Sequence, residues 1–285
     1  MEVYRGPART IAPMPGTAAL EARPDPFWTL PRLSRWFRKD LLHLGGLGLL
    51  VRDLARAAGQ RWEGGEILRQ MDALGVQSIS IANLTCLFTG MVLALQTAHS
   101  LAQFGGKLFV GRAVILSLTR ELGPVLTALM LAARCGAGVT AELGTMAVTE
   151  QVDALRALGS SPVRKLVLPR VVALTVMLPV LTLVAIFHGM FGGLLMAVFE
   201  LKIGASFYLS TTLQSLGFND LMHGLCKTPV FGLEIALIGC YNGLGATGGA
   251  DGVGRATTVA VVVSSITVLI TDFFLTKLFI ALPIG

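Results

Sequence analysis

Charged residues are scarce in this sequence, and their scarcity excludes most classes of soluble protein. Asp, Glu, Lys and Arg make up 14% of the 285 residues, while 53% are hydrophobic. A soluble domain carries roughly 25% charged residues, so the composition predicts an integral membrane protein. Nucleic-acid binding is not expected despite the net charge of +6, because the basic residues are concentrated near the start of the chain.

The sequence also lacks the spacings that metal, disulfide and nucleotide sites require. No CxxC, HxxxH or HExxH pattern occurs, so we expect the cysteines to be small core residues and assign no metal site. The glycine-rich stretch 245–255 lacks the GxxxxGK[ST] pattern and follows no strand, which excludes a phosphate-binding loop there. No serine has a histidine and an acid at the spacing of a nucleophile. The chain is therefore predicted not to be an enzyme and to hold no cofactor. The cysteines and histidines in question are Cys86, Cys135, Cys226, Cys240, His43, His99, His188 and His223.

The beginning of the chain differs from the rest. Residues 1–31 contain six of the twelve prolines, which predicts a disordered tail. Residues 32–58 mix leucines with arginines, and their apolar centre is shorter than the roughly 20 residues that cross a bilayer. We expect cytoplasmic or interfacial amphipathic helices over 32–77, because a signal peptide would place its apolar region earlier. Eleven of the 23 Lys and Arg residues precede residue 70, as in a cytoplasmic N-terminus.

Five long apolar runs follow, and they predict five transmembrane helices within residues 78–281. The expected spans are about 78–100, 112–147, 168–199, 222–244 and 257–281. The second is too long for a perpendicular span, so it must tilt, kink at Pro124 or project from the bilayer. A weak excess of basic residues in alternate loops agrees with a cytoplasmic N-terminus. We find no inverted repeat, and an odd number of spans is naturally completed by a two-fold partner.

Charged side chains inside these spans are costly and usually have a purpose. Arg120 and Glu121 are adjacent, so on a helix they point about 100° apart and cannot simply pair with each other. Two interpretations stay open for them. They form salt bridges to other helices, or they provide a polar feature in the path of an amphiphile, where Pro124 opens the backbone nearby.

Two further acids, Glu234 and Asp272, fall within the fourth and fifth spans. Each is a candidate proton or ion carrier. Each is also a candidate partner of Lys227 or Lys277, and we favour the partner role.

Small residues recur every fourth position in the second span. Such ridges let helices approach closely in lipid, so we expect tight packing within the bundle or within a dimer. The ridge residues are Ala133, Gly136, Ala137, Ala141 and Gly144, with Thr140 between them.

A short charged helix is predicted over 150–158. Thr149 can cap it, and the acids Glu150 and Asp153 suit the positive end of a helix. Gly159 ends it, and Ser161 with Pro162 is typical of a second helix start. A charged helix between two membrane spans is either a solvated loop helix or a docking surface for a soluble partner, and we favour docking.

Five motifs together resemble the MlaE (YrbE) permease family, the membrane subunits of ABC transporters that move phospholipids between bacterial membranes. The resemblance covers about 65–281 and excludes the proline-rich start; Glu234 is also not part of the family pattern. The motifs are GMVLALQ (90–96), RELGPV (120–125), AELGTMAVTEQVDAL (141–155), LVLPR (166–170) and GVGRATT (252–258).

The resemblance implies an all-α membrane protein with an interfacial N-terminal helix and five spans, in a homodimer. It implies a cytoplasmic ABC ATPase that binds ATP and Mg, a ring of MCE-domain proteins, and in some systems a STAS-domain protein. The lipid cavity is assigned to Arg120 and Glu121, with Met91, Leu93 and Gln96 as neighbours. ATPase coupling is assigned to Glu150, Gln151, Asp153, Leu155, Arg156 and Leu158.

The expected function is therefore ATP-driven phospholipid transport between inner and outer membranes, in a bacterial inner membrane, with the N-terminus cytoplasmic. A plastid envelope is an alternative location, although no transit peptide is recognisable. A sterol or another lipid is an alternative substrate, because it also needs an apolar cavity with a polar rim. From other classes, an ion-coupled carrier using Glu121, Glu234 or Asp272 and a scaffold that anchors an MCE ring stay open.

Overall fold

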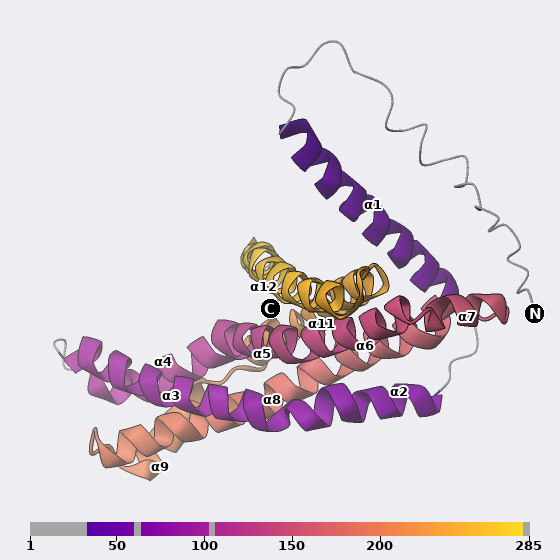
Figure 1. Cartoon of the computed structure of the whole chain (residues 1–285). Helices are drawn as coiled ribbons and strands as arrows, with labels where there is room; N and C mark the ends of the chain where they lie inside the picture. The colour runs from indigo at the N-terminus through magenta and orange to yellow at the C-terminus, as the bar shows by residue number, and fades with distance from the viewer. Residues whose placement is uncertain (1–32, 60–63, 103–105, 282–285) are drawn as a thin grey trace, which may run out of the picture. The chain divides into compact units, whose positions relative to one another are not determined.

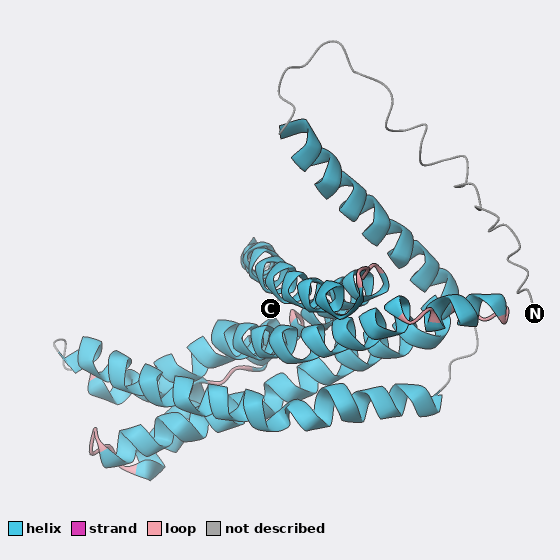
Figure 2. Ribbon diagram, in the orientation of Figure 1, coloured by secondary structure: helices cyan, strands magenta, loops and turns pink. Residues whose placement is uncertain are grey.

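The computed structural model describes residues 33–59, 64–102 and 106–281, and in this part of the chain every regular element is a helix. The expected tail at 1–31 lies outside the described residues. The chain divides into two compact units, Met1–Gly45 and Gly46–Gly285. Helix α1 (Leu33–Ala58) contains the end of the first unit and the start of the second. The second unit is a helical bundle (Figures 1 and 2).

Five helical stretches are long and apolar enough to cross a membrane, which confirms the predicted all-α membrane architecture. They are Gly64–Leu101, Val110–Val148, Val163–Phe199, Phe218–Leu244 and Gly249–Ala281. The first begins well before the predicted residue 78, because α2 (Gly64–Gln70) continues into α3 (Ile79–Ala102) through one π-turn and one 3-10 turn. No proline interrupts this stretch, so the helix continues through residues that were expected to lie outside the membrane.

The second span is helical throughout but interrupted by two π-turns. Helices α4 (Val110–Ser117), α5 (Gly123–Leu131) and α6 (Ala137–Val148) are separated by π-turns at Leu118–Leu122 and Ala132–Gly136. The first π-turn directly precedes Pro124, which lacks the backbone N–H of a regular helix. The predicted irregularity at this proline is therefore present, and it carries Arg120 and Glu121 within the π-turn.

The remaining helices complete the bundle. A fourth π-turn, Val163–Val167, leads into the long α8, the short α9 follows it, and α10 begins the fourth span. Their bounds are α7 Gln151–Ala157, α8 Leu168–Phe199, α9 Ala205–Ser215, α10 Phe218–Leu225, α11 Thr228–Leu244 and α12 Gly249–Ala281.

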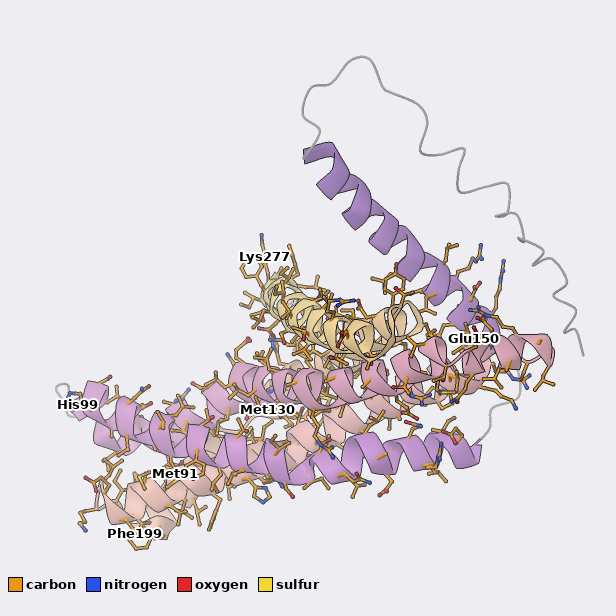
Figure 3. All side chains as sticks on the ribbon, in the orientation of Figure 1. Met91, His99, Met130, Glu150, Phe199 and Lys277 are labelled. Carbon is orange, nitrogen blue, oxygen red and sulfur yellow. The ribbon has the colours of Figure 1, made fainter. Side chains whose placement is uncertain are left out.

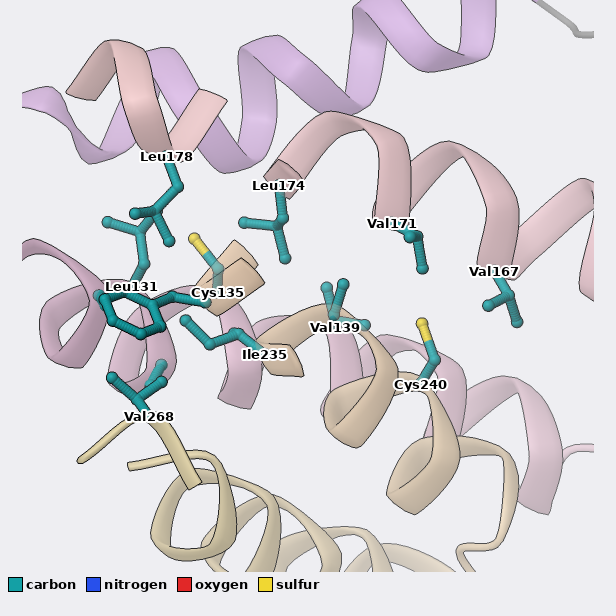
Figure 4. Packing of buried hydrophobic residues seen from close by; sticks show 14 of the residues in the cluster. Leu131, Cys135, Val139, Val167, Val171, Leu174, Leu178, Ile235, Cys240 and Val268 are labelled. Carbon is teal, nitrogen blue, oxygen red and sulfur yellow. The ribbon is translucent and has the colours of Figure 1, made fainter. Parts of the chain in front are cut away.

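The main core lies where α5, α6, α8 and α11 meet, with Val268 of α12 at its edge (Figure 4). Leu131, Leu174 and Ile235 are fully buried there. Cys135 and Cys240 fill this core, as expected of small apolar residues, and Cys86 is buried as well. Cys226 is exposed, so the expectation of a core residue was wrong for it. It follows α10 as its C-terminal cap, outside the packed helix faces.

Helices α3 and α8 approach each other closely through glycines. A Cβ at Gly90 would overlap the carbonyl of Gly189, and one at Gly192 would overlap the carbonyl of Leu87. Gly90 therefore has a packing role, which explains its place at the start of the motif at 90–96.

The small-residue ridge of α6 packs inside the chain. Thr140 Oγ1 donates to the carbonyl of Gly239 at 3.1 Å, and a Cβ at Gly144 would touch Ala246 and Val253 at 3.3 and 3.2 Å. This confirms packing within the bundle for the ridge through Gly136, Thr140 and Gly144. Along the parallel ridge, Ala133 is exposed and Ala137 and Ala141 are half-buried.

Candidate functional site

A buried lysine joins three helical segments in the second unit. Lys227, at the start of α11, has a side chain with 0% exposure. Its ammonium donates to Glu121 Oε1 at 2.9 Å, to Glu121 Oε2 at 3.0 Å and to Asp272 Oδ1 at 3.1 Å. Glu121 comes from the π-turn and Asp272 from α12. The interpretation of Glu121 as an interhelical salt-bridge partner is therefore confirmed, as is the partner role of Asp272.

The remaining hydrogen bonds of this cluster satisfy the lysine. Lys227 Nζ lies 2.6 Å from Thr276 Oγ1 and 3.2 Å from the carbonyl oxygen of Arg120. The Thr276 hydroxyl donates to Glu121 Oε1 at 3.1 Å. Such bonding is what allows a charge to stay buried. We call Glu121, Lys227, Asp272 and Thr276 the lysine cluster. Because it contains two carboxylates and one ammonium, its formal charge is −1 when all three groups are ionised.

Arg120 turns away from this cluster and binds another helix. Its Nε donates to Asp220 Oδ1 at 2.7 Å, and its Nη2 contacts the same oxygen. Asp220 belongs to α10, where its other carboxylate oxygen accepts from the N–H of Gly217 at 3.3 Å. Arg120 still has 54% of its side chain exposed, whereas Asp220 has 16%. The guanidinium is thus anchored on one side and accessible to a ligand on the other.

A small apolar pocket lies on the same helix as Asp220. Its volume is about 290 Å³, and its lining includes Phe218, Met222, His223 and Phe279. The His223 and Phe279 rings pack with their centroids 4.7 Å apart. The apolar pocket and the exposed guanidinium of Arg120 are linked through α10, because this helix lines the pocket and its Asp220 binds Arg120.

The predicted lipid-cavity residues on α3 have different neighbours from Arg120 and Glu121 within one chain. Met91 packs near Gly192 of α8, Leu93 packs against the cluster that contains Leu118, and Gln96 is exposed. In the part of the chain that the structure describes, no hydrogen bond or ion pair joins these three to Arg120 or Glu121. Figure 3 shows Met91 near the end of the bundle that carries Phe199, away from Glu150.

The other intramembrane acid, Glu234, has a neutral partner. Thr271 Oγ1 of α12 donates to Glu234 Oε1 at 2.6 Å. Its second oxygen is buried with no hydrogen-bond partner. The expected pairing of Glu234 with a lysine was therefore wrong, because its carboxylate meets Thr271, six positions before Lys277 on α12.

The short charged helix exists as α7, Gln151–Ala157, but the predicted cap was wrong. Thr149 Oγ1 donates backwards to the carbonyl of Thr145 at 2.7 Å. Glu150 is the N-cap residue and has a left-handed backbone with φ 61°. The predicted stop is present, since Gly159 has φ 72°. The chain thus turns sharply at both ends of α7.

The surface of α7 is charged on the outside and held by one buried residue. Val152 is buried, whereas Leu158 is 82% exposed. Arg156 Nη1 donates to Asp153 Oδ1 at 2.7 Å, and both side chains are exposed. Of the residues predicted to couple to an ATPase, Gln151 is also exposed and Leu155 is half-buried.

A buried arginine near the start of α8 was not assigned a role from the sequence. Arg170 has 2% exposure, and its Nη2 lies 2.8 Å from Glu142 Oε1. Its Nη1 donates to the carbonyl of Leu166 at 2.6 Å. Glu142 belongs to α6 and Arg170 to α8, so this ion pair joins the two helices between which α7 lies. The LVLPR motif that ends in Arg170 was the available signal.

Comparison with known proteins gives one family over most of the chain. A family profile described as Permease MlaE matches residues 67–278. A probable ABC transporter permease protein of Rickettsia felis is 46% identical over 213 residues, which are 75% of this chain and 82% of the relative.

Two other relatives carry more specific names. The intermembrane phospholipid transport system permease protein MlaE of Haemophilus influenzae is 38% identical over 213 residues, covering 74% of this chain and 82% of that protein. The chloroplastic protein TRIGALACTOSYLDIACYLGLYCEROL 1 of Arabidopsis thaliana is 37% identical over 212 residues, covering 74% and 61%.

Proposed function

This chain belongs to the MlaE permease family, and from that membership we propose that it is the membrane subunit of an ABC transporter that moves phospholipids between the inner and outer membranes. The observation that carries the proposal is the exposed charged helix α7, joined through α6 to the π-turn that holds Arg120 and Glu121. One continuous element thus connects a surface suited to a soluble partner with polar groups inside the membrane region.

Each proposed partner performs one step of the transport. A separate cytoplasmic ABC ATPase binds and hydrolyses ATP with Mg and docks on α7. A second copy of this chain completes the lipid cavity, an MCE-domain ring exchanges lipid on the far side, and a STAS-domain protein accompanies the ATPase. The phospholipid relative in Haemophilus influenzae supports phospholipid over sterol as the substrate.

In the proposed mechanism, ATP binding draws the two ATPases together and moves α7. The ion pair between Arg170 and Glu142 joins α6 and α8, the helices that precede and follow α7 in the chain, so the motion passes along both helices. The π-turn at Leu118–Leu122 is a point where α4 and α5 can reorient. The cavity between the subunits then narrows, and the lipid is expelled.

The exposed side of Arg120 is proposed to bind the lipid phosphate, because a guanidinium binds phosphate oxygens with strong charge-assisted hydrogen bonds. Asp220 holds the guanidinium in place. Within one chain, the residues Met91, Leu93 and Gln96 have other neighbours than Arg120. In the proposed dimer they would line the lipid path from the helices that face the other subunit.

The coupling role of α7 is tested by charge reversal at Glu150 and Asp153 in a reconstituted complex. We expect lipid transfer to be lost while ATP hydrolysis continues and the permease stays folded. Glu200→Lys is the matched control, because Glu200 is exposed and lies beyond the other end of α8. Normal lipid transfer by the reversed variant would refute the docking role.

Two rival functions are tested in the same system. The isolated chain would transport lipid on a proton gradient if it were an ion-coupled carrier. Two of its three candidate acids, Glu121 and Asp272, are instead bound by Lys227, which argues against free proton exchange at these two residues. Wild-type transfer by an Arg120→Ala, Glu121→Ala double variant would favour a scaffold for an MCE ring.

A further inference from the structure

A second apolar recess lies against the N-terminal part of α8, and all of its lining residues belong to the second unit. Its volume is about 440 Å³, within the range of ligand pockets. Leu54 and Ala58 of α1, Leu168, Val172 and Val176 of α8, and Leu233 of α11 line it. We call this recess the α1–α8 groove.

The groove is separate from the site around Arg120. Helix α8 passes both regions. Its residue Ile186 lies beside Gly123, which is two positions after Glu121. Val176 is ten residues earlier on α8, a distance of about 15 Å along the helix. The groove therefore does not share lining residues with the lysine cluster or with the pocket next to Asp220.

The groove opens to the surroundings of the bundle. Val51, Val176 and Leu233 are lining residues that keep 45%, 46% and 37% of their surface exposed. Two of these belong to spans that are long and apolar enough to cross a membrane. Outward-facing side chains of such spans contact the hydrocarbon of a bilayer. Water is a poor occupant because Thr175 is the one polar side chain of the lining, whereas a buried water needs two to four partners.

Basic residues lie close in sequence to the residues that line one end of the groove. Arg52 and Arg56 belong to the same α1 segment as Leu54 and are exposed by 54% and 71%. Lys165, exposed as well, precedes Leu168 by three residues, which is less than one helical turn.

The acidic groups nearby do not balance these charges. Asp53 is the acid of the α1 segment, and it lies 3.1 Å from Arg52 and 3.9 Å from Arg56. Glu142 is used by the buried Arg170, and Glu234, next to Leu233, binds Thr271. Asp53 pairs with two of the three exposed cations, which leaves a formal charge of +2 on these four residues and favours an anion.

We propose that the α1–α8 groove binds one acyl chain of an anionic phospholipid of the surrounding bilayer, whose phosphate is held by Arg52, Arg56 and Lys165. The segment from Leu168 to Val176 measures about 12 Å along α8, which fits the part of an acyl chain nearest its headgroup. The lipid fills the gap between α1 and the bundle and stabilises their packing. It is a bound structural lipid and not the transported one, so the inference does not depend on the proposed function.

The proposal is tested by native mass spectrometry on the purified full-length chain after removal of lipid in a neutral detergent. Dioleoylphosphatidylglycerol is titrated in one arm and dioleoylphosphatidylcholine in the other. We expect tight binding of phosphatidylglycerol and weaker binding of phosphatidylcholine. An Arg56→Gln, Lys165→Gln double variant should bind phosphatidylglycerol about 30-fold more weakly, because each basic group near an anionic lipid contributes roughly fivefold.

Variants that fill the groove separate it from other lipid-binding surfaces. Val172→Trp should abolish the phosphatidylglycerol preference, and Ala55→Leu is the smaller substitution if the tryptophan prevents folding. Val180→Trp is the matched control, since Val180 lies on the same helix with 48% exposure and outside the groove. Arg120→Ala should keep the preference, because Arg120 belongs to the other site.

Three results would overturn the proposal. They are equal affinity for the two lipids in the wild-type chain, unchanged binding in the groove-filling variants, and an equal loss in Val180→Trp. A change from dimer to monomer in Val172→Trp would show that a second copy of the chain covers the groove instead of a lipid.

Discussion

Lys227 and Glu121 form an ion pair whose two sides differ in solvent access: the lysine is fully buried, whereas Glu121 keeps 39% of its side chain exposed. The lysine therefore depends on its carboxylate partners, whereas Glu121 depends less on the lysine. This asymmetry decides what each substitution in the cluster does.

Replacement of Lys227 by Met should destabilise the permease by about 3 kcal/mol, at the lower end of the cost of breaking a buried pair, because Glu121 is partly solvated. It leaves Glu121 and Asp272 as neighbouring carboxylates that both contacted the same ammonium. Denaturant unfolding in detergent micelles measures the change. The triple variant Lys227→Met, Glu121→Gln, Asp272→Asn should recover part of the loss, and equal stabilities of Lys227→Met and wild type would contradict the structural role of the pair.

Replacement of Glu142 by Gln should uncouple ATP hydrolysis from lipid transfer. The accompanying loss of stability should be smaller than the loss of coupling. The substitution leaves the Arg170 guanidinium with a neutral partner between α6 and α8, so the two helices that flank α7 in the chain are held together less firmly. We expect basal ATPase activity in the reconstituted complex with transfer reduced about tenfold, a loss of roughly 1.4 kcal/mol of coupling.

The charge-swapped variant Glu142→Arg, Arg170→Glu tests whether the pair itself matters. Restored transfer is expected if the contact between the two helices is the essential feature. Glu66→Gln, which alters a nearby pair with Arg69 on the exposed α2, is the control and should transfer lipid normally. A Glu142→Gln variant with normal transfer would show that the ion pair does not transmit motion.

The sequence predicted the elements of this fold well because apolar run length alone identifies membrane helices. It also predicted α7, since Gly159 requires a left-handed backbone to end the helix. The interruptions were harder to predict. A π-turn needs only one extra residue in a helix, and no composition marks it except the proline at 124.

Most partners of the charged residues could not be predicted from one sequence, although Lys227 was one of the two lysines expected to pair with Asp272. Glu121 meets Lys227 across 106 positions and Arg120 meets Asp220 across 100, and nothing local to either residue encodes those pairings. Asp220 was missed altogether, because an acid in the first turn of a short helix is well explained by capping alone. Thr149 was predicted as a cap because its type suits one, but its hydroxyl finds a carbonyl one turn back.

Replacement of Glu150 by Gly separates the backbone role of this residue from its charge. Glu150 has φ 61°, which costs a residue with a side chain about 1 kcal/mol relative to glycine. We expect Glu150→Gly to raise the free energy of unfolding by up to about 1 kcal/mol while ATPase docking weakens.

Lys202→Gly is the matched control for that variant, since Lys202 has φ 56° and lies in the loop after α8. It should give a similar gain in stability with normal ATPase binding, measured by co-purification of the ATPase. Loss of docking in both variants, or in neither, would mean that the charge of Glu150 does not contribute to the docking surface.

The close packing of α3 on α8 depends on the absence of a side chain at Gly90. Gly90→Ala would place a methyl group against the carbonyl of Gly189, and that carbonyl belongs to backbone that cannot turn aside. The two helices must separate, so we expect a loss of about 2 kcal/mol, within the range for overpacked sites.

Gly138→Ala is the control for this variant, because a Cβ at Gly138 meets nothing within 4 Å inside the chain. In the monomer it should be neutral or stabilise α6 by up to about 1 kcal/mol, the helix preference of alanine over glycine. Thermal unfolding of both variants in detergent gives the comparison. If Gly90→Ala is as stable as Gly138→Ala, α3 and α8 do not make the close contact. If Gly138→Ala instead dissociates the dimer, the exposed side of α6 is part of the subunit interface.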